Sequence, residues 1–101
     1  MPGRFKPRWV SWQPGVTFYK PAGVPARALQ IVNITVEELE AIRLTDLNQL
    51  TQEQAAKQMN ISQPTFNRIL TSARQKIADA LVNGKAITIE GGRYVVKQGQ
   101  L

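Results

Sequence analysis

The sequence predicts a mainly α-helical fold: a helix-turn-helix bundle of three helices with an irregular N-terminal arm and a short C-terminal β-hairpin. Two threonine capping boxes and a Ser-x-Pro helix start mark three helices in the middle of the chain, whereas five of the six prolines lie within residues 1–33. We therefore divide the chain into a basic arm rich in proline and aromatic residues at 1–34, a helix-turn-helix domain at 35–84 and a hairpin tail at 85–101.

The segment at residues 51–70 has the spacing of a helix-turn-helix, the unit that inserts a recognition helix into the major groove of DNA. Thr51 is expected to cap the first helix of this unit, and Gln54 completes the capping box three residues later. The two helices are expected to cross closely, because the crossing positions hold the small residues Ala55 and Ala56.

The turn between these helices is expected at Asn60, because Asn is, after Gly, the residue that most readily adopts the left-handed conformation that ends a helix. Ser62 then caps the next helix, and Pro64 lies in its first turn, where an amide proton has no intrahelical partner. This recognition helix is expected to continue to about Val82 and to end at the Asn-Gly pair of residues 83–84.

The recognition helix has an apolar side and a polar side. The apolar side is expected to face the core and consists of Phe66, Ile69, Leu70, Ala73, Ile77, Ala80 and Leu81. The polar side has no carboxylate before Asp79 and consists of Gln63, Pro64, Thr65, Asn67, Arg68, Thr71, Ser72 and Gln75. Arg pairs with guanine and Asn or Gln with adenine, so this side can read bases. Any soluble amphipathic helix has a polar outer side, but the capped helix and turn before it favour base reading.

A support helix is expected to precede this unit, from the capping box of Thr35 and Glu38 to about residue 45. Its acids suit the positive end of a helix dipole but repel phosphates, so we expect this helix to point away from DNA. These acids are Glu37, Glu38 and Glu40, the apolar side is Leu39, Ile42 and Leu44, and the connection that follows is expected to bury Leu47 and Leu50.

The arm combines five basic residues with no acid in residues 1–33. One interpretation is a strap across DNA phosphates, made by Arg4, Lys6, Arg8, Lys20 or Arg27. The other is that the four aromatic residues Trp9, Trp12, Phe18 and Tyr19 pack onto the helical core; both interpretations can hold together. Residues 8–12 and 16–20 have a strand-like composition, with the turn signal Pro14-Gly15 between them.

The tail contains two short β-prone runs separated by Gly91-Gly92, which predicts a hairpin. Such a hairpin is either a wing, with Arg93 or Lys97 at the DNA, or a cover for the core. In the second arrangement Ile87, Ile89, Tyr94 and Val96 cover the core or pair with the N-terminal strand. We favour the second arrangement, because two isolated strands need hydrophobic cover to persist in water.

Composition limits the classes of function. Thirteen basic against seven acidic residues give a net charge of +6, which favours polyanionic partners. The chain has no Cys and no His, which argues against disulfides, thiol chemistry and transition-metal sites, and we expect no cofactor, no metal and no enzymatic activity. No apolar run approaches membrane-spanning length and no signal peptide is recognised, so a cytoplasmic location is expected.

The segments FYKPAGVP and SQPTFNRIL, with the helices between them, resemble a small prokaryotic family of uncharacterised, predicted DNA-binding proteins, and the resemblance spans residues 7–92. The helix-turn-helix is similar to region 4 of primary sigma factors. This resemblance implies base-reading roles for Gln63, Pro64, Asn67 and Arg68, and phosphate or base contacts for Thr65 and Thr71. The chain departs from these patterns at Pro64, which has no hydrogen-bonding side chain, at Gln63, which replaces a frequent charge, and at Ser11, where relatives often carry cysteines nearby.

The sequence thus predicts a non-catalytic protein that binds double-stranded DNA and acts as a transcriptional regulator, with Gln63, Asn67 and Arg68 reading bases. The alternative is a protein-interaction module with a sigma-like fold that reads no bases, and a third interpretation is a binder of structured RNA. A homodimer on two half-sites and contact with the transcription machinery are compatible with the sequence. The sequence does not determine the target DNA sequence or whether the protein activates or represses transcription.

Overall fold

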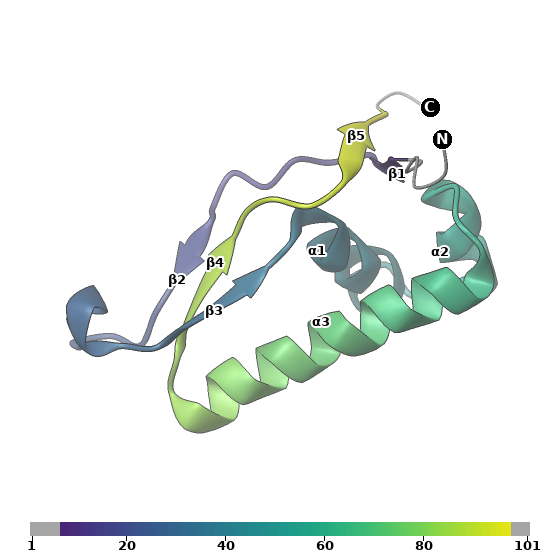
Figure 1. The fold of residues 1–101 in the computed structure, drawn as a ribbon. Coiled ribbons are helices and arrows are strands. Elements are labelled where there is room, and N and C mark those ends of the chain that lie inside the picture. Colours follow the sequence, from purple (N-terminus) through teal and green to yellow (C-terminus); the bar gives the residue numbers. More distant parts are fainter. Residues whose placement is uncertain (1–6, 98–101) are drawn as a thin grey trace, which may run out of the picture.

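A computed structural model describes residues 7–97. In chain order the elements are β1 (Arg8–Val10), β2 (Phe18–Tyr19), the 3-10 turn η1 (Ala26–Ala28), β3 (Ile31–Ile34), α1 (Val36–Ile42), the π-helical turn η2 (Arg43–Leu47), α2 (Gln52–Gln58), α3 (Gln63–Asn83), β4 (Ala86–Ile89) and β5 (Tyr94–Val96). Figure 1 shows α1 and α2 beside the first half of α3, and β2, β4 and β3 beside its second half. The three predicted helices are confirmed, and the strands form more sheet than the sequence predicted.

The helix starts and the turn follow the predicted residues. The hydroxyl oxygens of Thr35, Thr51 and Ser62 each accept a hydrogen bond from the backbone amide three residues later, and the two threonines form complete capping boxes. Asn60 has a φ of 60°, and Gly84 ends α3 in the left-handed conformation. These signals act within four residues along the chain, which is why the sequence alone could predict them.

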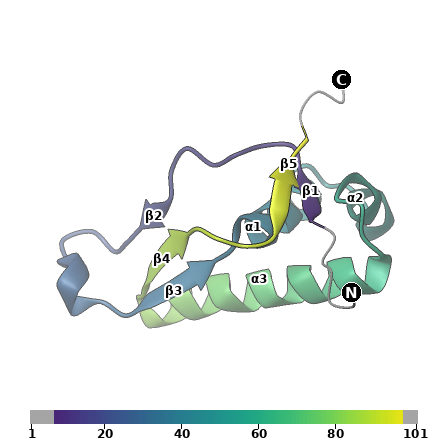
Figure 2. The same ribbon diagram turned by 45° about the horizontal axis from the view of Figure 1, so that its top comes forward.

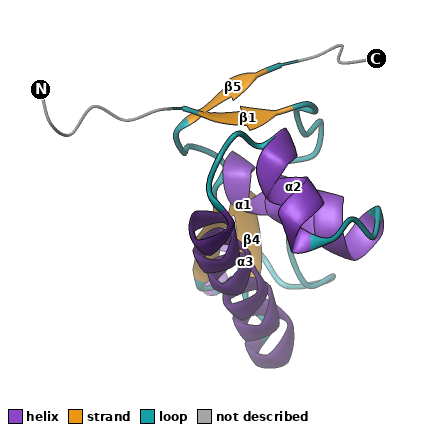
Figure 3. Cartoon of the chain, turned by 90° about the vertical axis from the view of Figure 1, so that its right-hand side faces the viewer, coloured by secondary structure: helices purple, strands orange, loops and turns teal. Residues whose placement is uncertain are grey.

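The tail differs from the predicted hairpin in its strand pairing. The chain turns at Gly91 and Gly92, but β4 pairs in parallel with β3 and antiparallel with β2, whereas β5 pairs in parallel with β1. Figure 2 shows β4 between β2 and β3, and Figure 3 shows the β1–β5 pair beside α1 and α2. The tail therefore joins the N-terminal strands, which is the alternative that the sequence favoured over a wing.

The arm is more regular than the sequence predicted, because residues 1–34 supply three strands. Strand β3 was not predicted, and its Ile34 is buried beside β4. The packing of the arm's aromatic residues on the core is only partial: Trp12, Phe18 and Tyr19 stay exposed, while Trp9 is half-buried. The arm is also held by strand pairing, of β1 with β5 and of β2 with β4.

The core consists of two clusters. The first lies between the helices and contains Ala41, Leu44, Ala55, Ala56, Met59, Phe66, Ile69 and Leu70. The second joins the sheets to the helices and contains Val10, Ile34, Val36 and Ile89, with Leu39 and Ile77 packed against it. Most of the predicted apolar side of the recognition helix is thus confirmed as core.

Two leucines expected in the core are exposed. Leu81 is 74% exposed, because α3 extends past α1 and its last turns bury Ala80 but not the neighbouring residue. Leu47 is 71% exposed because η2 is a π-helical turn, in which the Asn48 amide donates to the Arg43 carbonyl five residues back. This wider turn rotates the side chains that follow away from the α-helical period. Leu50 is half-buried against the first cluster, as expected.

Candidate nucleic-acid interface

Helices α2 and α3 form the candidate interface, and their crossing is set by small buried residues. Ala55 and Ala56 are 0% and 3% exposed and lie in one cluster with Phe66. The amide of Ile61 donates to the Ala56 carbonyl over 3.1 Å and closes the turn around Asn60. The crossing predicted from the alanines is confirmed, and it leaves the start of α3 exposed at one end of the molecule.

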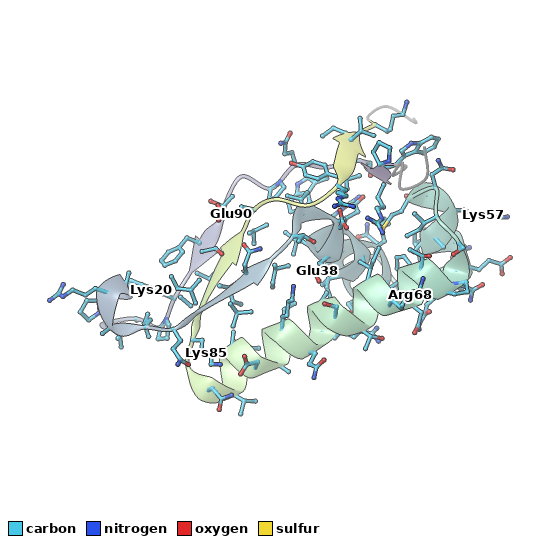
Figure 4. All side chains as sticks on the ribbon, viewed as in Figure 1. Lys20, Glu38, Lys57, Arg68, Lys85 and Glu90 are labelled. Atoms are coloured by element: carbon cyan, nitrogen blue, oxygen red, sulfur yellow. The ribbon has the colours of Figure 1, made fainter. Side chains whose placement is uncertain are left out.

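A shallow depression of about 530 Å³ lies at this end. Four of the predicted DNA-binding residues line it together with one residue of α2: Gln63, Pro64, Asn67, Arg68 and Gln52. The fold therefore brings the four central candidate residues to one surface. Thr71 is also exposed, one helical turn beyond Asn67. Figure 4 shows Arg68 near the start of α3, at the same end of the molecule as Lys57 of α2.

Hydrogen bonds orient the polar side chains of this surface. The Asn67 side-chain amide donates to Oε1 of Gln52 over 3.0 Å, and a guanidinium nitrogen of Arg68 donates to Oγ1 of Thr65 over 3.2 Å. Both bonds are exposed, so each donor can exchange its partner for a ligand at little cost. Gln52 was not predicted as a site residue, and the only sequence signal for it is its position in the first turn of α2, the helix before α3.

Two residues of the predicted polar side are engaged inward. Thr65 is half-buried, and its hydroxyl oxygen accepts a hydrogen bond from the Ser62 hydroxyl over 3.0 Å as part of the helix cap. Ser72 is half-buried and donates to Oε2 of Glu38 over 2.7 Å. Ser72 was expected to face outward, but helix α1 packs across α3 at this point and supplies the buried carboxylate.

The three acids of α1, Glu37, Glu38 and Glu40, are buried. The sequence had predicted only that they point away from DNA. Glu38 accepts hydrogen bonds from Ser72 and from the Lys76 ammonium, which lies 3.0 Å from its Oε1. Burial raises the pKa of Glu38, but the hydrogen bonds from Ser72, the Thr35 amide and Lys76, with the Lys76 charge, outweigh it and hold the pKa below its ordinary value. The charge of this carboxylate is therefore neutralised inside the protein.

The other two acids bind the arm and the tail to α1. Glu40 is 2% exposed and receives the Arg43 guanidinium at 2.8 Å, together with the amide and hydroxyl of Ser11. Glu37 pairs with Arg8 at 3.2 Å and accepts the Arg93 amide at 2.7 Å. Ser11, the position noted for departing from relatives, thus has a structural partner in Glu40.

Within the part of the chain that the structure describes, no cation of the arm lines the depression at the start of α3. The Arg8 side chain is 19% exposed and forms an ion pair with Glu37, so a phosphate would have to compete with that carboxylate. Arg4 and Lys6 lie outside the described residues. Of the two tail cations considered for a wing, Lys97 lies 5.1 Å from the centre of the Trp9 ring, and Arg93 is exposed.

No helix within residues 7–97 is both long enough and apolar enough to cross a membrane. The model of a protein family described as "protein of unknown function DUF134" matches residues 1–97. A UPF0251 protein of Caldanaerobacter subterraneus subsp. tengcongensis is 62% identical over 96 residues, which cover 95% of this chain and 81% of that protein.

Two further relatives come from other organisms. A UPF0251 protein of Moorella thermoacetica is 62% identical over 87 residues, covering 86% of this chain and 58% of its own length. A UPF0251 protein of the Methanocella arvoryzae strain is 60% identical over 88 residues, covering 87% of this chain and 53% of its own length. No solved structure matches the chain.

Proposed function

The chain belongs to the DUF134 family, and we propose that it binds double-stranded DNA sequence-specifically and acts as a transcriptional regulator. In this proposal the first turns of α3 enter the major groove and Gln63, Asn67 and Arg68 contact base edges. The proposal assigns no catalytic step to the chain. It extends to the transcription machinery only as far as the resemblance to sigma region 4 implies.

The observation that carries the proposal is the exposed polar surface at the start of α3. Its residues combine the side chains that pair with guanine and adenine, and α3 holds no acid between its start and Asp79. Helix α2 and the left-handed turn at Asn60 set this surface at the end of the molecule, in the order that helix-turn-helix proteins use. A polar helix side without this framework would support DNA binding much less.

The distribution of charge supports the same proposal. Within residues 7–97, five cations pair with acids of the chain itself: Arg8, Arg43, Arg74, Lys76 and Lys85. Most of the negative charge is therefore neutralised internally, while the chain as a whole keeps a net charge of +6. Lys57 and Arg68 lie outside these pairs, and both lie at the end of the molecule where α3 begins (Figure 4). Cations in this position attract phosphates on both sides of a groove.

The test is a selection of bound fragments from a random DNA duplex pool, followed by affinity measurements on the enriched site at several salt concentrations. We expect one enriched sequence, and an affinity that falls with salt with a logarithmic slope of about −0.9 per neutralised phosphate. Absence of enrichment, together with a flat salt response, would contradict the proposal and favour the protein-interaction module. Preference for folded RNA over duplex DNA in a competition assay would contradict it as well.

A further inference from the structure

One hydrogen bond joins α2 to α3 at the depression of the candidate interface. The side-chain amide of Asn67 in α3 donates through Nδ2 to Oε1 of Gln52 in α2 over 3.0 Å, and both residues line the depression. The two positions are 15 residues apart in the chain, and α2 lies beside the first half of α3 (Figure 1). The bond therefore depends on how the two helices cross.

This bond leaves a donor and an acceptor available on Asn67. A side-chain amide has two protons on its nitrogen and one acceptor oxygen, and Gln52 takes one of the protons. Within residues 7–97 the Asn67 side chain forms no other hydrogen bond, and Asn67 is exposed. Its second Nδ2 proton and its Oδ1 can thus bind a ligand while the bond to Gln52 is kept.

We propose that Asn67 reads an adenine and that Gln52 is the positioning residue that holds the Asn67 amide for this contact, an inference that rests on the proposed function. In the major groove adenine presents the acceptor N7 beside the N6 amino donor, which match the remaining proton and the Oδ1 of Asn67. Guanine presents two acceptors there, so Oδ1 would lie against one of them. The amide cannot turn over to suit guanine without losing its bond to Gln52.

The surroundings of Gln52 suit a positioning role. Gln52 is half-buried, whereas Asn67 is exposed. The capping box at the start of α2 is made by Thr51 and Gln54, so the side chain of Gln52 takes no part in it. A substitution at Gln52 therefore tests the orientation of Asn67 and leaves the cap of α2 in place. A side chain that is already held also loses less conformational freedom when it binds.

Arg68 is held in a different way at the same surface. One of its guanidinium nitrogens donates to Oγ1 of Thr65 over 3.2 Å, three residues earlier in α3. This contact lies within one helix and does not involve α2. We therefore expect a substitution at Gln52 to change the base preference that Asn67 produces and to leave the preference that Arg68 produces unchanged.

The experiment uses the duplex enriched from the random pool and a set of duplexes in which one base pair at a time is exchanged. For each protein we measure the ratio of the affinities for the enriched and the exchanged duplex. We expect Asn67→Ala to lower this ratio roughly 5- to 150-fold at one A·T pair. Gln52→Ala is expected to lower it roughly 2- to 10-fold at the same pair. Arg68→Ala is expected to act at a different pair.

Three further variants separate positioning from other effects. Gln52→Glu keeps an oxygen that accepts from Asn67, so we expect it to restore the ratio at this pair while its negative charge weakens binding to every duplex. Gln52→Ala combined with Asn67→Ala is expected to lose no more at this pair than Asn67→Ala alone. Gln58→Ala is the matched control, because Gln58 is exposed at the end of α2 and does not line the depression.

A readout without DNA checks the bond itself. We expect the Nδ2 proton resonances of Asn67 in the NMR spectrum of the full chain to shift in Gln52→Ala and to stay in place in Gln58→Ala. Unchanged resonances in Gln52→Ala would overturn the inference and leave the proposed function standing.

The DNA measurements can overturn the inference in three ways. The first is a Gln52→Ala protein with an unchanged ratio at the pair that Asn67 reads, or with an equal change at every pair. The second is an Asn67 whose pair is not A·T, and the third is a Gln52→Glu protein that loses as much discrimination as Gln52→Ala. A pool without any enriched duplex would instead contradict the proposed function, and this inference with it.

Discussion

Ser72 of α3 donates its hydroxyl proton to Oε2 of Glu38 in α1 over 2.7 Å. The same carboxylate receives the Thr35 amide at 2.9 Å through Oε1 and the Lys76 ammonium at 3.0 Å. One buried side chain therefore joins the cap of α1 to the middle of α3. This link adds polar contacts between α1 and α3 to the apolar contacts that Ala41 and Leu44 make with α3.

We predict that Glu38→Gln lowers the free energy of unfolding by about 2 kcal/mol at neutral pH, because a hydrogen-bonded buried charge is lost and Lys76 keeps no carboxylate. The measurement is urea unfolding, with Glu90→Gln as the control because Glu90 is exposed. A loss no larger than that of the control would show that the link contributes nothing.

The same carboxylate predicts a pH dependence. The pKa of Glu38 in the folded protein lies below its ordinary value of 4.5, so the unfolded chain binds this proton more tightly. The stability that Glu38 contributes is then fully present above pH 4.5 and is lost as the pH falls through the lower folded pKa. We expect the wild type to lose stability over this acidic range more steeply than Glu38→Gln. Parallel stability curves for the two proteins would contradict the prediction.

Gly91 and Gly92 allow the cost of backbone strain to be separated from the cost of close contact, because both have a positive φ but only Gly92 has close neighbours. A Cβ atom at Gly92 would lie 3.0 Å from Oε1 of Glu37 and 3.1 Å from Cβ of Thr35, whereas one at Gly91 meets no atom within 4 Å. Both residues have positive φ, 79° and 111°. We expect Gly91→Ala to cost about 1 kcal/mol and Gly92→Ala about 2 to 4 kcal/mol in unfolding experiments. Equal costs would mean that Glu37 and Thr35 move aside freely.

Arg68→Ala tests base reading. We expect a loss of roughly 1 to 3 kcal/mol on the preferred DNA site and a relaxed preference at one base pair. Arg74→Ala is the control, because Arg74 lies on the same helix and pairs with Asp46 at 2.7 Å. An equal loss for Arg68→Ala on every sequence would show that Arg68 contacts only phosphate.

We expect the basic residues of the arm to fall into two groups: Arg4 and Lys6, which affect only DNA binding, and Arg8, which also affects stability. We expect Arg4→Ala combined with Lys6→Ala to weaken binding to all DNA sequences and to reduce the logarithmic salt slope by about 0.9 for each phosphate that is no longer neutralised. Arg8→Ala is expected to lower the stability of the fold as well, because Arg8 pairs with the buried Glu37. A changed base preference with an unchanged slope would mean that the arm does not act on phosphates.

The segment of α2, the turn at Asn60 and α3 was the most predictable part of the molecule. Its caps at Thr51 and Ser62 and its turn at Asn60 depend on contacts within four residues, and the periodicity of α3 identifies Phe66 as core. The same local signals bring Gln63, Pro64, Asn67 and Arg68 to one surface, because residues three to four apart share a helix face. The partner of Asn67 on α2, Gln52, could not be identified in this way, since it lies across a tertiary contact.

The sequence by itself determined where the helices of this protein begin and turn, because a cap, a left-handed residue and an apolar period are properties of a few neighbouring residues. Only the tertiary structure decided which strands pair, that Glu37 and Glu38 of α1 are buried against Arg8 and Lys76, and that Leu81 is exposed. Each of these depends on groups far apart in the chain, and a pattern of neighbours carries no information on which distant partner a residue meets.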